Sequence, residues 1–219
     1  MDLKIIFGVA VFAIIALLIG LMLPGADQPV PQTYPWQIEV TADGTTKVFG
    51  LTLGATTLQQ AERIFGEQAE ISLFDPAADS SRKNIEAYFD KLILGGLSAR
   101  MVLGFSFTSE QLQIMFERGR RISTLGDGSH KVTLHSEDIS AVHREPIVSI
   151  TYLSRITLDE ASIKQRFGEP AQVIKESDSA MTHWLYPDKG LDVALDEKGN
   201  GVLQYVPPSQ FSQLLKPLK

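Results

Sequence analysis

Hydrophobic residues recur at helical spacing in several stretches of the chain. In one of them Leu58, Ala61 and Phe65 lie at positions i, i+3 and i+7, which places them on one face of a helix. Thr57 precedes this stripe, with Gln60 three residues later, as in an N-terminal capping box. The pattern predicts helices at 57–66, 108–119, 136–146 and 157–168, with further capping boxes that begin at Thr108 and Thr157.

Other stretches alternate between hydrophobic and polar positions, as a strand with one buried face requires. At 191–195, Leu191, Val193 and Leu195 alternate with Asp192. A hairpin is predicted at 36–53, and a loop followed by a strand at 125–135. Single strands are predicted at 69–74, 85–94, 99–107, 147–153, 171–177, 182–187, 191–195 and 202–206. The basic stretch RGRR at 118–121 is interpreted as a solvated helix end.

The segment at 5–23 carries no charged residue. A helix of this length spans about 28 Å, close to the hydrocarbon thickness of a bilayer. We therefore expect an uncleaved transmembrane anchor, with a cleaved signal peptide as the alternative. Lys4 precedes the span and the next basic residue is Lys47, so the positive-inside rule places residues 1–4 in the cytoplasm. In a bacterium with two membranes, the anchor then lies in the inner membrane and the body in the periplasm.

Residues 24–35 contain four prolines and predict an extended stalk. Beyond them, two segments share the letters FGE at the end of a predicted helix: TTLQQAERIFGEQ at 56–68 and TLDEASIKQRFGEP at 157–170. Internal duplication and coincidence are the two explanations, because short motifs also recur by chance. We expect an α+β fold of two αβββ-type repeats with antiparallel sheet, preceded by the transmembrane helix. The predicted repeats span 36–122, with a leading hairpin, and 123–219.

These segments resemble the repeat of the small outer-membrane assembly lipoproteins of the SmpA/OmlA (BamE) type. In the second segment Gly168, Pro170, Trp184 and Tyr186 stand at the motif positions, while the first segment retains Gly66. A tandem pair of such units resembles the architecture of the β-lactamase inhibitory protein. The resemblance implies a binding scaffold in the cell envelope. The chain departs from those lipoproteins because it has no cysteine to carry a lipid.

Composition excludes several kinds of chemistry. Without cysteine there is no disulfide, thiol nucleophile or cysteine-ligated zinc. A formal net charge of −6 argues against nucleic acid, which rewards clustered Lys and Arg. No catalytic residue, metal site or cofactor is predicted. The histidines lack the helical spacing of a zinc-binding pair and are interpreted as surface residues: His130, His135, His143 and His183.

The remaining candidates are aromatic. Trp184 and Tyr186 lie two apart in a predicted strand and so share a face. With Tyr88 and Trp36 they form the predicted protein-binding surface, provided that their face is open; core packing is the alternative role of each.

The leading hypothesis for function is a non-catalytic, membrane-anchored periplasmic adaptor or assembly factor. Its partner would be another envelope or inner-membrane protein. The alternatives are an envelope hydrolase with a site between the repeats, and a sensor that binds a small ligand or peptidoglycan.

Overall fold

The computed structural model describes residues 34–77, 82–154, 157–176 and 179–218. The chain divides into two units, Met1–Gln32 and Thr33–Lys219, and the description below concerns the second. The predicted anchor and nearly all of the predicted stalk lie outside the described residues. Among the helices that the structure does describe, none has the length and hydrophobicity needed to cross a membrane.

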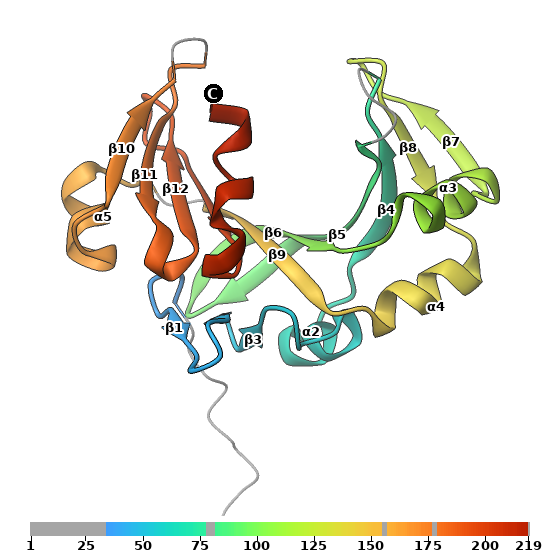
Figure 1. Ribbon diagram of the computed structural model, residues 1–219, viewed down its shortest axis with the longest axis horizontal. Coiled ribbons are helices and arrows are strands. Elements are labelled where there is room, and N and C mark those ends of the chain that lie inside the picture. Colours follow the sequence, from blue (N-terminus) through green and yellow to red (C-terminus); the bar gives the residue numbers. More distant parts are fainter. Residues whose placement is uncertain (1–33, 78–81, 155–156, 177–178, 219) are drawn as a thin grey trace, which may run out of the picture. The chain divides into compact units, whose positions relative to one another are not determined.

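Ten antiparallel strands form one curved sheet in the order β10-β11-β12-β13-β9-β6-β5-β4-β8-β7 (Figure 1). In chain order they are β4 (Glu70–Asp75), β5 (Asn84–Leu94), β6 (Leu97–Phe105), β7 (Arg121–Thr124), β8 (His130–Thr133), β9 (Ile147–Ser154), β10 (Gln172–Lys175), β11 (Thr182–Tyr186), β12 (Leu191–Leu195) and β13 (Gly201–Tyr205). A second sheet, made from the predicted N-terminal hairpin region, has three short strands: β1 (Glu39–Val40), β2 (Thr46–Val48) and β3 (Leu51–Thr52).

This topology shows that the expected fold class is wrong. The described residues are dominated by antiparallel sheet, with few and short helices, rather than by two αβββ repeats. β9 pairs with β13 on one side and with β6 on the other, so strands from both predicted repeats join in one sheet. The reason is physical: alternation along a strand indicates its buried face, but not which strand lies beside it.

The two FGE segments also differ in conformation. Gly66 ends its helix in the left-handed region, with φ 68° and ψ 16°, the usual αL termination. Gly168 has φ 85° and ψ −171°, which only glycine adopts easily. The first helix leads into an interior strand, β4, whereas the second leads into the edge strand β10. The shared letters therefore do not specify one repeated backbone.

The helix predictions succeed because their capping chemistry is local. The helices are α2 (Leu58–Phe65), α3 (Ser109–Glu117), α4 (Ser136–Arg144) and α5 (Glu160–Phe167). The capping box at Thr57 and Gln60 is confirmed, and Thr108 opens α3 in the same way. The third cap is not the expected Thr157: the side chain of Asp159 accepts the backbone N–H instead. Short 3-10 helices complete the described chain: η2 (Pro187–Lys189), η3 (Pro208–Gln213) and η4 (Lys216–Leu218).

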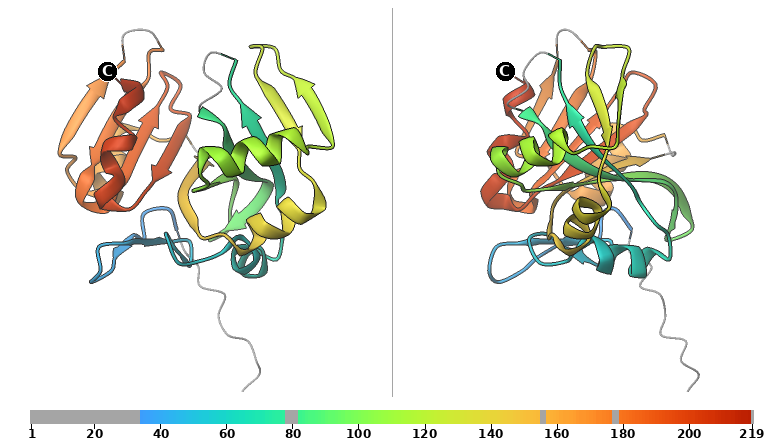
Figure 2. Two further views of the ribbon diagram at one scale, coloured as in Figure 1. Left: turned by 45° about the vertical axis from the view of Figure 1, so that its right-hand side comes forward. Right: turned by 90° about the vertical axis from the view of Figure 1, so that its right-hand side faces the viewer.

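The main core lies on the outer face of the curved sheet, beneath the α-helices and the small sheet (Figures 1 and 2). Phe49 shows how tightly the small sheet is joined to this core. It occupies the turn between β2 and β3 with φ 55°, a strained conformation for a bulky residue. Its ring is buried between Tyr152 and Tyr205, with centroids 5.1 and 5.6 Å away. Burial of this aromatic surface offsets the strain.

Candidate functional site

The inner face of the sheet is chemically unlike the outer face. Along β5, Ile85, Ala87 and Phe89 are buried against the core, whereas the alternating residues Glu86 and Tyr88 are only half-buried. The same alternation continues through β6 and β9. The middle of the inner face therefore presents mixed polar and aliphatic side chains that the fold does not fully cover.

Two adjoining hollows lie on this face, with volumes of about 330 and 240 Å³. The 3-10 helix η3 stands beside them on the inner side of the curved sheet (Figure 1). We call the combined space the inner groove, and its lining consists of the residues of either hollow. Six residues line both hollows: Asn84, Ile85, Phe105, Val148, Gln210 and Gln213.

Several polar groups of the groove have no partner among the residues that the structure describes. Within the described part of the chain, five of its side chains make no hydrogen bond: Ser106, Ser149, Thr151, Gln210 and Gln213. Asn84 donates from Nδ2 to Oε1 of Glu86 at 2.7 Å, which orients that carboxylate. Hydroxyl and amide groups both donate and accept. The groove can thus both donate hydrogen bonds to a ligand and accept hydrogen bonds from it.

Close packing of two strands shapes the groove floor. A Cβ on Gly104 would lie 2.3 Å from Oγ of Ser149, closer than atoms can approach. Glycine at this position leaves the Ser149 hydroxyl room between β6 and β9. Aliphatic groups of Val102 and Val148 complete the lining, so the floor combines hydrogen-bonding and apolar contacts, as ligand sites usually do.

The structure places the predicted aromatic surface residues apart from this groove. Trp184 and Tyr186 are only 7% and 4% exposed, so the face they share is closed. The hydroxyl of Tyr186 donates to the carbonyl of Gly168 at 2.9 Å. Burial raises the pKa of Tyr186 to about 12, with a further contribution from the charge of Glu169. The condition attached to this prediction, an open face, is not met.

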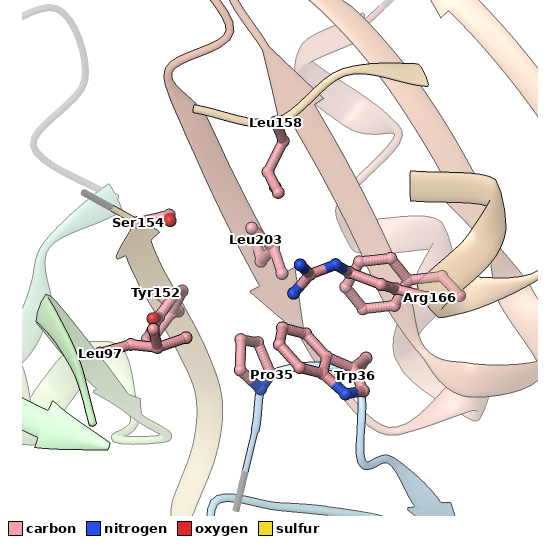
Figure 3. A pocket seen from close by; sticks show the side chains of 9 residues that line it. Pro35, Trp36, Leu97, Tyr152, Ser154, Leu158, Arg166 and Leu203 are labelled. Atoms are coloured by element: carbon pink, nitrogen blue, oxygen red, sulfur yellow. The ribbon is translucent and has the colours of Figure 1, made fainter. Parts of the chain in front are cut away.

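Trp36 belongs to a strap at the start of the described unit, Tyr34–Trp36. The guanidinium of Arg166 lies over the Trp36 ring, 4.0 Å from its centroid (Figure 3), and Tyr34 stacks on Trp36 at 4.9 Å. The buried hydroxyl of Tyr205 donates to the carbonyl of Pro35 at 2.8 Å. The cavity beside the strap measures about 10 Å³, space for no more than about one water.

Tyr88 alone among the four lies on the inner face, half-buried, where its hydroxyl donates to Asp90 at 3.0 Å. It does not line the inner groove. The groove residues were therefore missed in the sequence analysis, and half of them are Gln, Ser, Thr and Val of ordinary appearance. A weak signal was present in the polar positions of 84–86 and 149–151, but η3 joins them only through the tertiary fold.

His183, expected at the surface, is buried. Its Nδ1 lies 2.8 Å from Oδ2 of the fully buried Asp192, and its Nε2 lies 3.4 Å from Oε1 of Glu176. The hydrogen bond to Asp192 raises the pKa of His183 against the opposing effect of burial, and the two carboxylate charges add to the rise. Alternation in 182–186 and 191–195 could have indicated this pair, because it places both side chains on one face of neighbouring strands.

Comparisons with known proteins identify no family. No family model matches the chain, and no curated protein matches it. A solved structure that is similar belongs to a DUF4309 family protein (YjgB) from Bacillus subtilis subsp. subtilis str. 168, with a TM-score of 0.37 and 12% identity. The match covers 75% of this chain and 88% of that chain. At this TM-score the likeness carries no argument about function, and the SmpA/OmlA resemblance stays a prediction.

Proposed function

We propose that the chain is a non-catalytic adaptor of the bacterial envelope that binds another protein in the inner groove. Membrane attachment through residues 5–23, with the body in the periplasm, is part of this proposal and rests on the hydrophobic pattern of that segment. The observation that carries the binding function is the set of polar side chains that line the groove and have no partner among the described residues.

The chemistry of these groups suits a polypeptide. A side-chain amide offers one acceptor oxygen and two N–H donors. A backbone peptide group needs an acceptor for its N–H and a donor for its C=O. Gln210 and Gln213 stand on η3, opposite the Ser149 and Thr151 hydroxyls of the floor. A backbone segment in the groove can exchange its water contacts for these amides and hydroxyls. Val102 and Val148 would bury an aliphatic side chain of the same segment.

The test is capture of a partner from native membranes. The tagged full-length protein is purified in mild detergent, and proteins bound in stoichiometric amount are identified by mass spectrometry. The test variant is Gln210→Ala with Gln213→Ala. The matched control is Gln59→Ala with Gln165→Ala, which removes two exposed amides on α2 and α5. We expect the partner to be lost from the test variant only. Equal recovery with both variants, or no stoichiometric partner at all, would sink the proposal.

A second candidate function, a peptidoglycan-binding sensor, draws on the same amides. N-acetylated sugars carry a secondary amide, and Phe105 and Phe107 at the groove offer rings on which a sugar can pack. Calorimetric titration with soluble peptidoglycan fragments separates the two functions. Binding of the fragments that is lost with Gln210→Ala and Gln213→Ala, without a protein partner, would favour the sensor.

A further inference from the structure

The ten-stranded sheet ends at β7 in an uncovered edge. Among the strands that the structure describes, β7 pairs with β8 alone, through the register Arg121 to Thr133 and Thr124 to His130. It lies at the outer margin of the sheet in Figures 1 and 2. Ile122 is 51% exposed and Leu125, just after the strand, is 39% exposed. The sequence interpretation missed this strand, because its first residue belongs to the RGRR stretch that was assigned to a helix end.

The hydrogen-bond pattern shows which backbone groups of β7 are free. Leu125 donates its N–H to the carbonyl of Ser129 at 2.8 Å, beside the hairpin turn. In an antiparallel ladder the hydrogen-bonded pairs recur at every second residue. Ser123 and Arg121 therefore bond to β8, and the N–H and C=O groups of Ile122 and Thr124 point away from the sheet. They form the template onto which one more strand can add.

The side chains of this edge have different chemistry on its two faces. Arg121 pairs across the ladder with Thr133 and lies on the same face as Lys131, whereas Ile122 pairs with the buried Val132 on the core face. Arg120 and Arg121 are exposed and make no ion pair with any described residue. Lys131 is neutralised by an ion pair with Glu70 at 2.6 Å, so the positive charge of this face comes from Arg121. The other face carries Ile122 beside Thr124, on a chain whose formal net charge is −6.

We propose that the β7 edge binds an extended segment of another protein in which acidic and aliphatic residues alternate. The added strand bonds to the free backbone groups of Ile122 and Thr124. Its carboxylates face Arg121 and its aliphatic side chains pack beside Ile122, because successive residues of a strand point to opposite faces. This surface is separate from the inner groove, and it gives the adaptor a second interface.

The other edge of the sheet, β10, shows what the side-chain charges of β7 add to backbone pairing. β10 also ends the sheet, and Val173 there is 49% exposed. Its charged residues are of both signs: Lys175 within the strand and Glu169 and Glu176 near its ends. Backbone pairing alone would make both edges equal. Of these two described edges, β7 is the one whose charge is complementary to an acidic strand.

The experiment titrates the full chain, in mild detergent, with a short capped peptide that alternates glutamate and valine. A peptide of the same composition in scrambled order and one with lysine in place of glutamate are the probe controls. Binding is followed by NMR, which also shows whether the Ile122 and Thr124 amides gain protection from exchange. We expect binding of the alternating acidic peptide only.

Three variants locate the site. Thr124→Pro removes an outward N–H that β8 does not use, and should weaken binding about tenfold, the effect of one backbone hydrogen bond. Arg121→Glu should weaken it further, by repelling the carboxylates. Val173→Lys, a change at an exposed position of the β10 edge, should leave affinity unchanged. Circular dichroism and the β8 amide shifts check that each variant folds.

Several outcomes would overturn the proposal: equal binding of the scrambled peptide, equal loss with Val173→Lys, or no loss with Thr124→Pro. Self-association that Ile122→Lys abolishes, without peptide binding, would assign the edge to a second copy of the chain instead. Partner capture through the groove does not depend on these residues, so the failure of one proposal leaves the other standing.

Discussion

The two faces of β6 differ although the same backbone carries both. Leu103, on the outer face, is fully buried in the main core, whereas Val102, one residue earlier, faces the inner groove and is half-buried. The outer face binds the sheet to its helices through close packing. The inner face of β6 contributes little to that packing, and polar groups beside it have no partner among the described residues. If the proposed function holds, stability and recognition depend on alternate residues, and each can be changed with little effect on the other.

The largest expected effect is on the outer face. Leu103→Ala leaves a cavity in the core and should lower the free energy of unfolding by about 2–5 kcal/mol. Val102→Ala removes two methyl groups at a half-exposed position and should cost less than about 1 kcal/mol. Urea unfolding of both variants measures the difference. Similar losses from the two variants would show that the inner face is part of the core.

A smaller effect is expected where η3 and η4 cover the inner face. They pack over Leu185 and Ile174, on the same face as His183 and Asp192. Asp192→Asn replaces a buried charged partner and should cost about 1–3 kcal/mol. At this end of the sheet the inner face is itself buried, in a second cluster of Leu185, Val206 and Phe211, and it contributes to stability.

The His183–Asp192 pair also predicts a pH dependence. The pKa of His183 is raised above its ordinary value of 6.5, so the folded state binds the proton more tightly than the unfolded state. Its contribution to stability is fully present below pH 6.5 and is lost as pH rises through the raised pKa. The urea concentration at the midpoint of unfolding is measured below and above pH 7. In the wild type it should be lower at alkaline pH, and this decrease should be smaller in Asp192→Asn. Parallel curves for the two proteins would contradict this assignment.

The smallest effect is expected in the groove. Gln210→Ala with Gln213→Ala removes two amides without a described hydrogen-bond partner, and should change the free energy of unfolding by no more than about 0.5 kcal/mol. The same variant is expected to lose the bound partner. A large loss of stability would mean that these amides support η3, and the capture result would then need the single variants.

Local chemistry was predictable from the sequence and tertiary pairing was not. The caps at Thr57 and Thr108, the stripe of Leu58 and Ala61, and most strands were found because each depends on residues close together in the chain. The strand order was missed because β9 joins β6 to β13 across long stretches of chain. No local pattern records such a pairing.

The candidate site was the least predictable part. Trp184 and Tyr186 attracted attention because they are large and aromatic, and those properties placed them in the core. Gln210 and Gln213 are unremarkable in sequence. They matter because η3 brings them to the sheet beside Ser149 and Thr151. A site made from ordinary residues is visible only once the fold has assembled it.

The bond from Tyr205 to Pro35 gives the molecule a point of mechanical attachment. Tyr205 ends β13, an interior strand that is paired on both sides. A pull on the chain at Tyr34 would reach this strand through the strap and would meet the stacked Trp36 and Arg166 as well. Tension applied from the N-terminal side is thus transferred to the middle of the sheet and shared among many backbone hydrogen bonds, whereas tension at either edge would peel one short strand at a time.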